Sequence, residues 1–139
     1  MSSIKFGTSG WRGIIAEDFT YEAVRIVTQS IADYLKAYHE DKKGVVVGYD
    51  ARFMGDRFAS EVVRVLAGNG IKSFLTTGPT PTPAISFEIM RRKAGGGINI
   101  TASHNPPEYN GLKFSSPSGE PALPAVTREI EQKANEMLL

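Results

Sequence analysis

The feature that most constrains this chain is a regular alternation of short, β-branched segments with longer segments of helical periodicity. Three consecutive valines at residues 45–47 stand close to glycines on either side, which is typical of a strand buried on both faces of its sheet. Before them, residues 21–38 place apolar side chains three or four positions apart, the spacing of one apolar stripe on a helix. Strands that alternate with helices in this way predict an α/β domain with a mostly parallel sheet.

The same alternation continues along the rest of the chain. We expect further strands at residues 71–76, 98–103 and 112–115, and further helices at residues 56–69, at residues 83–92 and around Val126, Ile130 and Met137. A chain of 139 residues has the size of one domain with one packed core. We therefore predict a single domain over residues 1–139, a three-layer α/β/α sandwich with a mixed, mostly parallel sheet of about four strands.

The charge balance and the composition exclude several functional classes. Sixteen Lys and Arg residues against fifteen Asp and Glu residues give a net charge of +1, so no overall field would attract nucleic acid or an anionic membrane. The absence of cysteine excludes disulfides, thiolate metal sites and a cysteine nucleophile. The sequence has no apolar signal segment at its start and no apolar run of the roughly 18 residues that a membrane span needs. We expect a cytoplasmic protein without nucleic-acid or membrane partners.

Three unusual segments are expected to meet at the carboxyl edge of the sheet, where ligands bind in open sheets of this class. The first, residues 6–13, holds three glycines that let backbone N–H groups approach an anion, and an arginine that can grip phosphate oxygens. The second, residues 101–106, places a serine, a histidine and an asparagine on a loop that proline stiffens. The third, residues 109–113, contains an Asn-Gly pair typical of a turn, which would bring Lys113 back toward the serine.

Each segment also has an ordinary structural interpretation. The glycine-rich segment matches neither the P-loop nor the dinucleotide-binding pattern. Arg12 could form a surface ion pair, and Lys113 could be a solvated side chain. Asp50 and Arg52, which follow the valine-rich strand, fit an ion pair in a loop as well as they fit a functional site. These residue types at these spacings leave both interpretations open.

A serine hydrolase is the weakest hypothesis for the second segment. Ser103 and His104 are adjacent, and adjacent side chains in an extended segment point in opposite directions. The sequence has no Gly-x-Ser-x-Gly elbow, and no third member of a triad can be named.

Taken together, the motifs resemble the first domain of the alpha-D-phosphohexomutases, the phosphoglucomutase and phosphomannomutase superfamily. The resemblance rests on residues 6–13, 101–106 and 109–113, with supporting matches at residues 48–52 and 79–84. Its most specific part is the Ser-His-Asn-Pro signature with a lysine ten residues after the serine. The matching segments occur in the family's order along the whole chain.

The resemblance implies a reversible shift of phosphate between O1 and O6 of a hexose, carried out by an enzyme that is phosphorylated on serine. Ser103 matches that phosphoserine. Arg12 and Lys113 would supply positive charge around the moving phosphoryl group, and Lys113 would act as general base or acid at the attacking hydroxyl. His104 and Asn105 are expected to orient the phosphoserine loop.

The resemblance also implies ligands and further domains. Thr8, Ser9 and Gly10, with the arginine and asparagine already named, are expected to bind phosphate. Mg²⁺ is the expected cofactor, with Ser103 contributing a ligand through its phosphate, and a hexose 1,6-bisphosphate is the expected activator.

Family members normally have four domains, and this chain lacks the Asp-Gly-Asp-x-Asp stretch that holds their magnesium. The expected partners are therefore a hexose phosphate and the remaining mutase domains, without which we expect no turnover. The sugar stays open between glucose, mannose and an amino sugar. The alternative function is a non-catalytic module of the same fold that binds a sugar phosphate or another protein.

Overall fold

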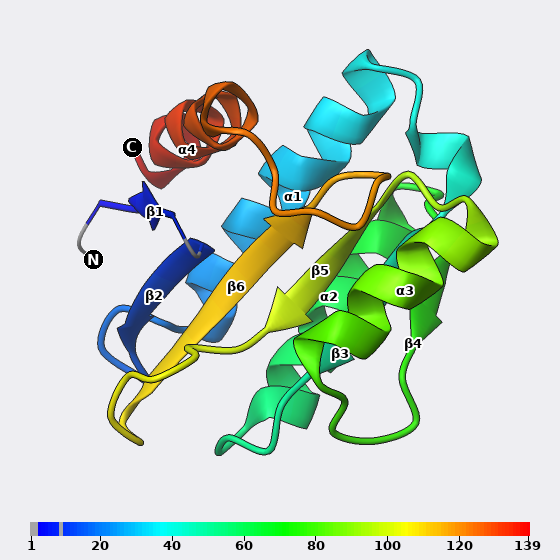
Figure 1. Cartoon of the computed structure of the whole chain (residues 1–139). Helices are drawn as coiled ribbons and strands as arrows, with labels where there is room; N and C mark the ends of the chain where they lie inside the picture. Colours follow the sequence, from blue (N-terminus) through cyan, green and yellow to red (C-terminus); the bar gives the residue numbers. More distant parts are fainter. Residues whose placement is uncertain (1–2, 9) are drawn as a thin grey trace.

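The computed structural model describes residues 3–8 and 10–139, and within them a mixed sheet lies between layers of helices (Figure 1). The helices of the described residues are α1 (Tyr21–Ala37), α2 (Gly55–Gly68), α3 (Thr82–Arg92) and α4 (Pro124–Leu138), with a 3-10 turn at Asp41–Lys43. The strands of the same residues are β1 (Phe6–Gly7), β2 (Gly10–Ile14), β3 (Val45–Tyr49), β4 (Ser73–Leu75), β5 (Gly96–Ile100) and β6 (Tyr109–Ser115).

The strands lie side by side in the order β1-β2-β6-β5-β3-β4. The pairs β3·β4 and β3·β5 are parallel, whereas β5·β6, β2·β6 and β1·β2 are antiparallel. The predicted α/β class and mixed sheet are confirmed. In the part of the chain that the structure describes, however, the sheet has six strands rather than about four, and two of its five pairings are parallel.

Side chains that alternate along the strands divide the core between the two faces of the sheet. Val45 and Val47 of β3 join the larger cluster, which the buried faces of α1, α2 and α4 complete. Val46 faces the other way and packs with Ile85 and Ile89 of α3. The valine run is therefore buried on both faces, as the sequence predicts, and the three layers of the sandwich follow from it.

The additional strands, β1 and β2, lie in residues 6–14, where the sequence indicates a glycine-rich segment for binding an anion and no strand. Trp11 of β2 is buried, its ring lies 4.6 Å from that of Phe19, and in the β2·β6 pair it stands opposite Leu112. Burial of one large aromatic ring anchors this glycine-rich segment as a strand beside β6. Its neighbour Arg12 points to the opposite face, because successive side chains of a strand alternate.

The predicted turn at Asn110 and Gly111 is wrong, because both residues lie inside β6. The N–H of Thr101 donates to the Gly111 carbonyl at 2.9 Å, so Gly111 takes part in the hydrogen bonding between neighbouring strands. The chain reverses earlier, in residues 103–108 between β5 and β6. No helix of the described residues is long and apolar enough to cross a membrane.

Candidate functional site

Ser103 lies on an exposed loop at the carboxyl end of β5. We call residues 101–108, which connect β5 to β6, the Ser103 loop. The Ser103 side chain is exposed, and its backbone has a φ of 54°, in the left-handed region that serine seldom adopts. Its N–H donates to the Thr101 hydroxyl at 3.1 Å. The loop therefore presents a serine hydroxyl to solvent on a backbone that its surroundings hold in an unusual conformation.

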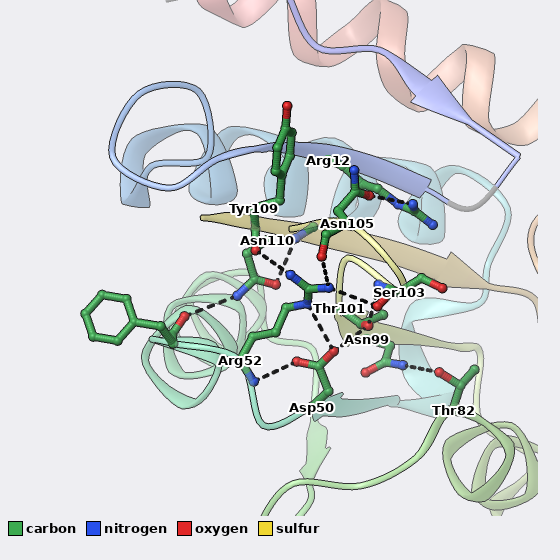
Figure 2. Close-up of polar contacts among 12 residues, drawn as sticks. Arg12, Asp50, Arg52, Thr82, Asn99, Thr101, Ser103, Asn105, Tyr109 and Asn110 are labelled. Carbon is green, nitrogen blue, oxygen red and sulfur yellow. Dashed lines mark hydrogen bonds and ion pairs between the residues drawn. The ribbon is translucent and has the colours of Figure 1, made fainter. Parts of the chain in front are cut away.

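Arg12 reaches from β2 to this loop (Figure 2). Its Nη1 donates to Asn105 Oδ1 at 2.6 Å. The side chain crosses Gly111 of β6, where an added Cβ would lie 3.0 Å from Arg12 Cγ. The absence of a side chain at Gly111 thus leaves room for a guanidinium to approach the Ser103 loop from a strand much earlier in the sequence.

Lys113 leaves the sheet on the same face as Arg12. Its neighbours Leu112 and Phe114 are buried in the core beneath the sheet, so Lys113 points to the opposite face. It is half-buried and stands opposite Asn99 of β5, four residues before Ser103. The structure therefore places two cationic side chains on one face of the sheet, and one of them, Arg12, contacts the loop that carries Ser103.

The first segment contributes an open depression beside Arg12. Thr8, Gly10 and Arg12 line it together with Lys5 and Gly7, and its volume is about 310 Å³. Gly10 has a φ of 93° and approaches β6 so closely that an added Cβ would lie 2.5 Å from a backbone oxygen. The fourth predicted member of this group, Ser9, lies outside the described residues.

A second depression, of about 510 Å³, adjoins the Ser103 loop. Ser103 and Asn105 line it together with residues 50–53 and Pro107. Arg12, which lines the first depression, donates a hydrogen bond to Asn105, which lines the second. His104 is exposed on the same loop.

From the sequence, Asp50 and Arg52 fit a loop ion pair as well as a functional site, and Thr101 carries no signal of its own. The structure places all three in direct contact with each other or with the Ser103 loop (Figure 2). The Arg52 guanidinium donates to four backbone carbonyls between Ser103 and Tyr109. The sequence signal for Asp50 and Arg52 is their position just after β3, since side chains at the carboxyl end of a buried strand commonly contribute to a ligand-binding site.

The groups whose pKa departs clearly from its usual value lie on the helices or, in the case of Tyr38, directly after α1. Burial raises the pKa of Tyr34 on α1, and a hydrogen bond from Arg25 lowers the pKa of Glu61 on α2. On α3, hydrogen bonds from Arg91 and then Arg92 hold the pKa of Glu88 at about 2. These shifts arise from burial and from contacts between helical side chains.

A magnesium ion would not find a complete set of ligands among the described residues. No group of three or more His, Cys, Asp or Glu side chains in this part of the chain could hold a metal ion. The carboxylate of Asp50, which contacts the loop through Thr101, already accepts hydrogen bonds from Thr101 and from the backbone of Arg52. A phosphate on Ser103 would supply one ligand.

Comparison with known proteins identifies the family. The family model described as "Phosphoglucomutase/phosphomannomutase, alpha/beta/alpha domain I" matches residues 3–138. A phosphoglucomutase from Staphylococcus saprophyticus is 35% identical over 95% of this chain, and a phosphoglucosamine mutase from Prochlorococcus marinus (strain MIT 9215) is 38% identical over 99%. This chain spans 24% and 28% of the lengths of those two relatives.

A solved structure shows the same fold. A crystal structure from Thermus thermophilus that carries the name phosphomannomutase superposes with a TM-score of 0.90 at 41% sequence identity. The match covers 97% of this chain and 30% of that one. The family match over nearly every residue, together with this superposition, shows that the chain belongs to the phosphoglucomutase/phosphomannomutase family and corresponds to its first domain, the α/β/α domain I.

Proposed function

We propose that this chain is the phosphoserine domain of a hexose-phosphate mutase, which interconverts hexose 1-phosphate and hexose 6-phosphate. One observation carries the proposal. An exposed serine hydroxyl lies on a loop that Arg12 contacts directly, with Lys113 on the same face of the sheet. Phosphoryl transfer depends mainly on positioning and on positive charge around the moving oxygens, and this arrangement can supply both.

The proposed reaction has two transfers. In the first, a free hydroxyl of the hexose phosphate attacks the phosphorus of phosphorylated Ser103, the bond from phosphorus to Ser103 Oγ breaks, and a hexose 1,6-bisphosphate forms. The hydroxyl proton passes to a base, the role we assign to Lys113 in its neutral form. In the second, Ser103 Oγ attacks the phosphorus of the other phosphate, the bond from that phosphorus to the sugar oxygen breaks, and the sugar oxygen takes the proton back from Lys113. This step restores the phosphoenzyme and leaves the product hexose phosphate. Arg12 would stabilise the negative charge of the phosphoryl oxygens in both steps.

The reaction would also need a metal ion, a place for the sugar phosphate and the remaining domains. Mg²⁺ would supply positive charge at the phosphoryl group, and the ligand available here is an oxygen of phosphorylated Ser103. Thr8 and Gly10 line the depression beside Arg12, a place for a sugar phosphate. Because the chain spans about a quarter of its curated relatives, we expect turnover when the remaining domains are present and none from this domain alone.

Turnover of two serine variants tests the proposal in the intact mutase that carries this chain. Ser103→Ala should abolish conversion of hexose 1-phosphate, because no phosphoryl acceptor remains. The matched control is Ser118→Ala, which removes an exposed hydroxyl from the loop between β6 and α4 and should retain full activity. Full turnover by the Ser103→Ala enzyme would reject the proposal. Binding of hexose phosphate without any phosphoserine would instead indicate the non-catalytic module.

A further inference from the structure

Next to the candidate phosphoserine, both terminal nitrogens of the Arg52 side chain donate to backbone carbonyls of the Ser103 loop and of the first residue of β6. Its Nη2 donates to the carbonyls of Ser103 at 2.9 Å and Asn105 at 2.6 Å. Its Nη1 donates to the carbonyls of Pro106 at 2.9 Å and Tyr109 at 3.1 Å. The side chain is 15% exposed. One guanidinium thus fixes the backbone from the serine to the first residue of β6 (Figure 2).

Arginine has the shape that this contact needs. Its planar fork carries five N–H donors in fixed directions, and here two nitrogens serve four carbonyls that converge on one point. Four carbonyl oxygens that face one another would repel without a cation among them. A lysine ammonium has three donors on a compact head and cannot span the same four acceptors.

Asp50 holds Arg52 and the serine backbone at the same time. Its Oδ1 accepts from the backbone N–H of Arg52 at 3.0 Å, and its Oδ2 lies 3.7 Å from Arg52 Nε. Oδ2 also accepts the hydroxyl of Thr101 at 2.6 Å, and that hydroxyl in turn accepts the N–H of Ser103 at 3.1 Å. The N–H and the carbonyl of Ser103 are therefore both connected to the Asp50 and Arg52 pair.

This double attachment explains how Ser103 keeps its uncommon backbone. A φ of 54° is disfavoured for serine, and such a conformation persists where surrounding contacts determine it.

The Asp50 and Arg52 pair also has an electrostatic consequence. Asp50 and Ser103 line one depression, so an unpaired Asp50 carboxylate would oppose a phosphate on Ser103. Arg52 neutralises that carboxylate.

We propose that Arg52 is a positioning residue for phosphoryl transfer: it holds the Ser103 loop in the conformation that presents the serine, and it shields a phosphate there from Asp50. The inference rests on the proposed function of Ser103. Arg52 acts through the loop and not by contact with the sugar, so its loss should reduce kcat while the KM for hexose phosphate changes little. A misplacement of about 1 Å at a reacting group can cost on the order of 100-fold in rate.

The test compares three variants of the intact mutase. Arg52→Lys keeps the charge without the fork, Arg52→Gln removes the charge, and Asp50→Asn removes the partner carboxylate. The control is Arg64→Gln on the outer face of α2, where the side chain is 77% exposed and pairs with Glu61. We expect kcat to fall roughly 10- to 100-fold for both Arg52 variants. A smaller loss is expected for Asp50→Asn, and none for the control.

Hydrogen exchange provides the readout that a general loss of stability would not reproduce. Backbone amides in residues 103–109, including Asn105 and Tyr109, should exchange faster in the Arg52 variants, while the amides of α1 and β3 keep their protection. If Arg52→Gln does not fold, Arg52→Lys decides the question by the same two measurements. Wild-type kcat in a folded Arg52→Lys enzyme, or exchange that accelerates equally throughout the domain, would overturn the inference.

The outcome for Ser103→Ala separates the two proposals. An inactive Ser103→Ala enzyme combined with a fully active Arg52→Lys enzyme would reject the positioning role alone. An active Ser103→Ala enzyme would reject the phosphoserine itself, and the role of Arg52 in phosphoryl transfer with it.

Discussion

Replacing Gly111 by alanine tests how closely the chain is packed where β2, β6 and the Ser103 loop meet. An added Cβ would lie 2.5 Å from the Thr101 carbonyl oxygen and 2.7 Å from that of Trp11, whereas ordinary contacts begin near 3.4 Å. The first oxygen would therefore have to retreat by about 0.9 Å and the second by about 0.7 Å. Both belong to backbone that the sheet holds, so flexible side-chain motion cannot relieve the clash.

The magnitude follows from this geometry. Overpacking a well-packed site by one methyl group costs typically about 1–3 kcal/mol, and two backbone clashes place Gly111→Ala at about 2–3 kcal/mol of unfolding free energy. For a chain of this length the melting temperature should fall by roughly 6–10 °C. A stability of about 5–15 kcal/mol would leave the variant folded and measurable.

Urea unfolding monitored by circular dichroism measures the effect, with Gly68→Ala as the matched control. An added Cβ at Gly68, the last residue of α2, meets nothing within 4 Å. The control should therefore be unchanged or more stable by up to about 1 kcal/mol, because alanine favours the helix. Equal unfolding free energies for the two variants would refute the close approach of the Thr101 and Trp11 carbonyl oxygens to Gly111.

Three further predictions concern the core, the acid response and the site. Phe58→Ala should lower the unfolding free energy by roughly 3–5 kcal/mol in a urea titration, since the ring is buried and lies 4.8 Å from that of Phe19; a loss below about 1 kcal/mol would contradict this core. Arg25 lowers the pKa of Glu61 in the folded state, so this pair stabilises the fold above the unfolded pKa of about 4.3 and loses that contribution as the pH falls through the folded pKa. Glu61→Gln should therefore be less stable by about 0.5 kcal/mol at neutral pH and converge with the wild type in acid melts; a constant difference at all pH values would contradict the ion pair. Lys113→Ala should lower kcat by about 100-fold or more, while calorimetry should still detect binding of hexose phosphate to the variant enzyme. An unchanged kcat would exclude Lys113 as the general acid and base.

Elements that depend on local patterns could be predicted from the sequence. The helix at residues 21–38 and the strand at the three valines follow from periodicity and β-branching, and the structure confirms both as α1 and β3. The strands of residues 6–14 could not be predicted in this way. β2 owes its position to pairing with β6 and to the burial of Trp11, contacts between residues about 100 positions apart.

The candidate site likewise contains features that could be predicted from the sequence and features that could not. The serine, histidine and asparagine motif marked the Ser103 loop, because the chemistry depends on the side chains themselves. The role of Arg52 was hidden because its acceptors are backbone carbonyls, which every residue carries and no sequence pattern marks. Gly111 was interpreted as a turn residue for a related reason, since the sequence shows that a side chain is missing but not what occupies the space.

The location of the phosphate tests the account most directly. The intact mutase is incubated with a hexose 1,6-bisphosphate, digested, and its phosphopeptides are identified by mass spectrometry. We expect one phosphate, on Ser103, and none on the Ser103→Ala enzyme. A phosphate on a different residue, or continued turnover with Ser103 unmodified throughout, would contradict it.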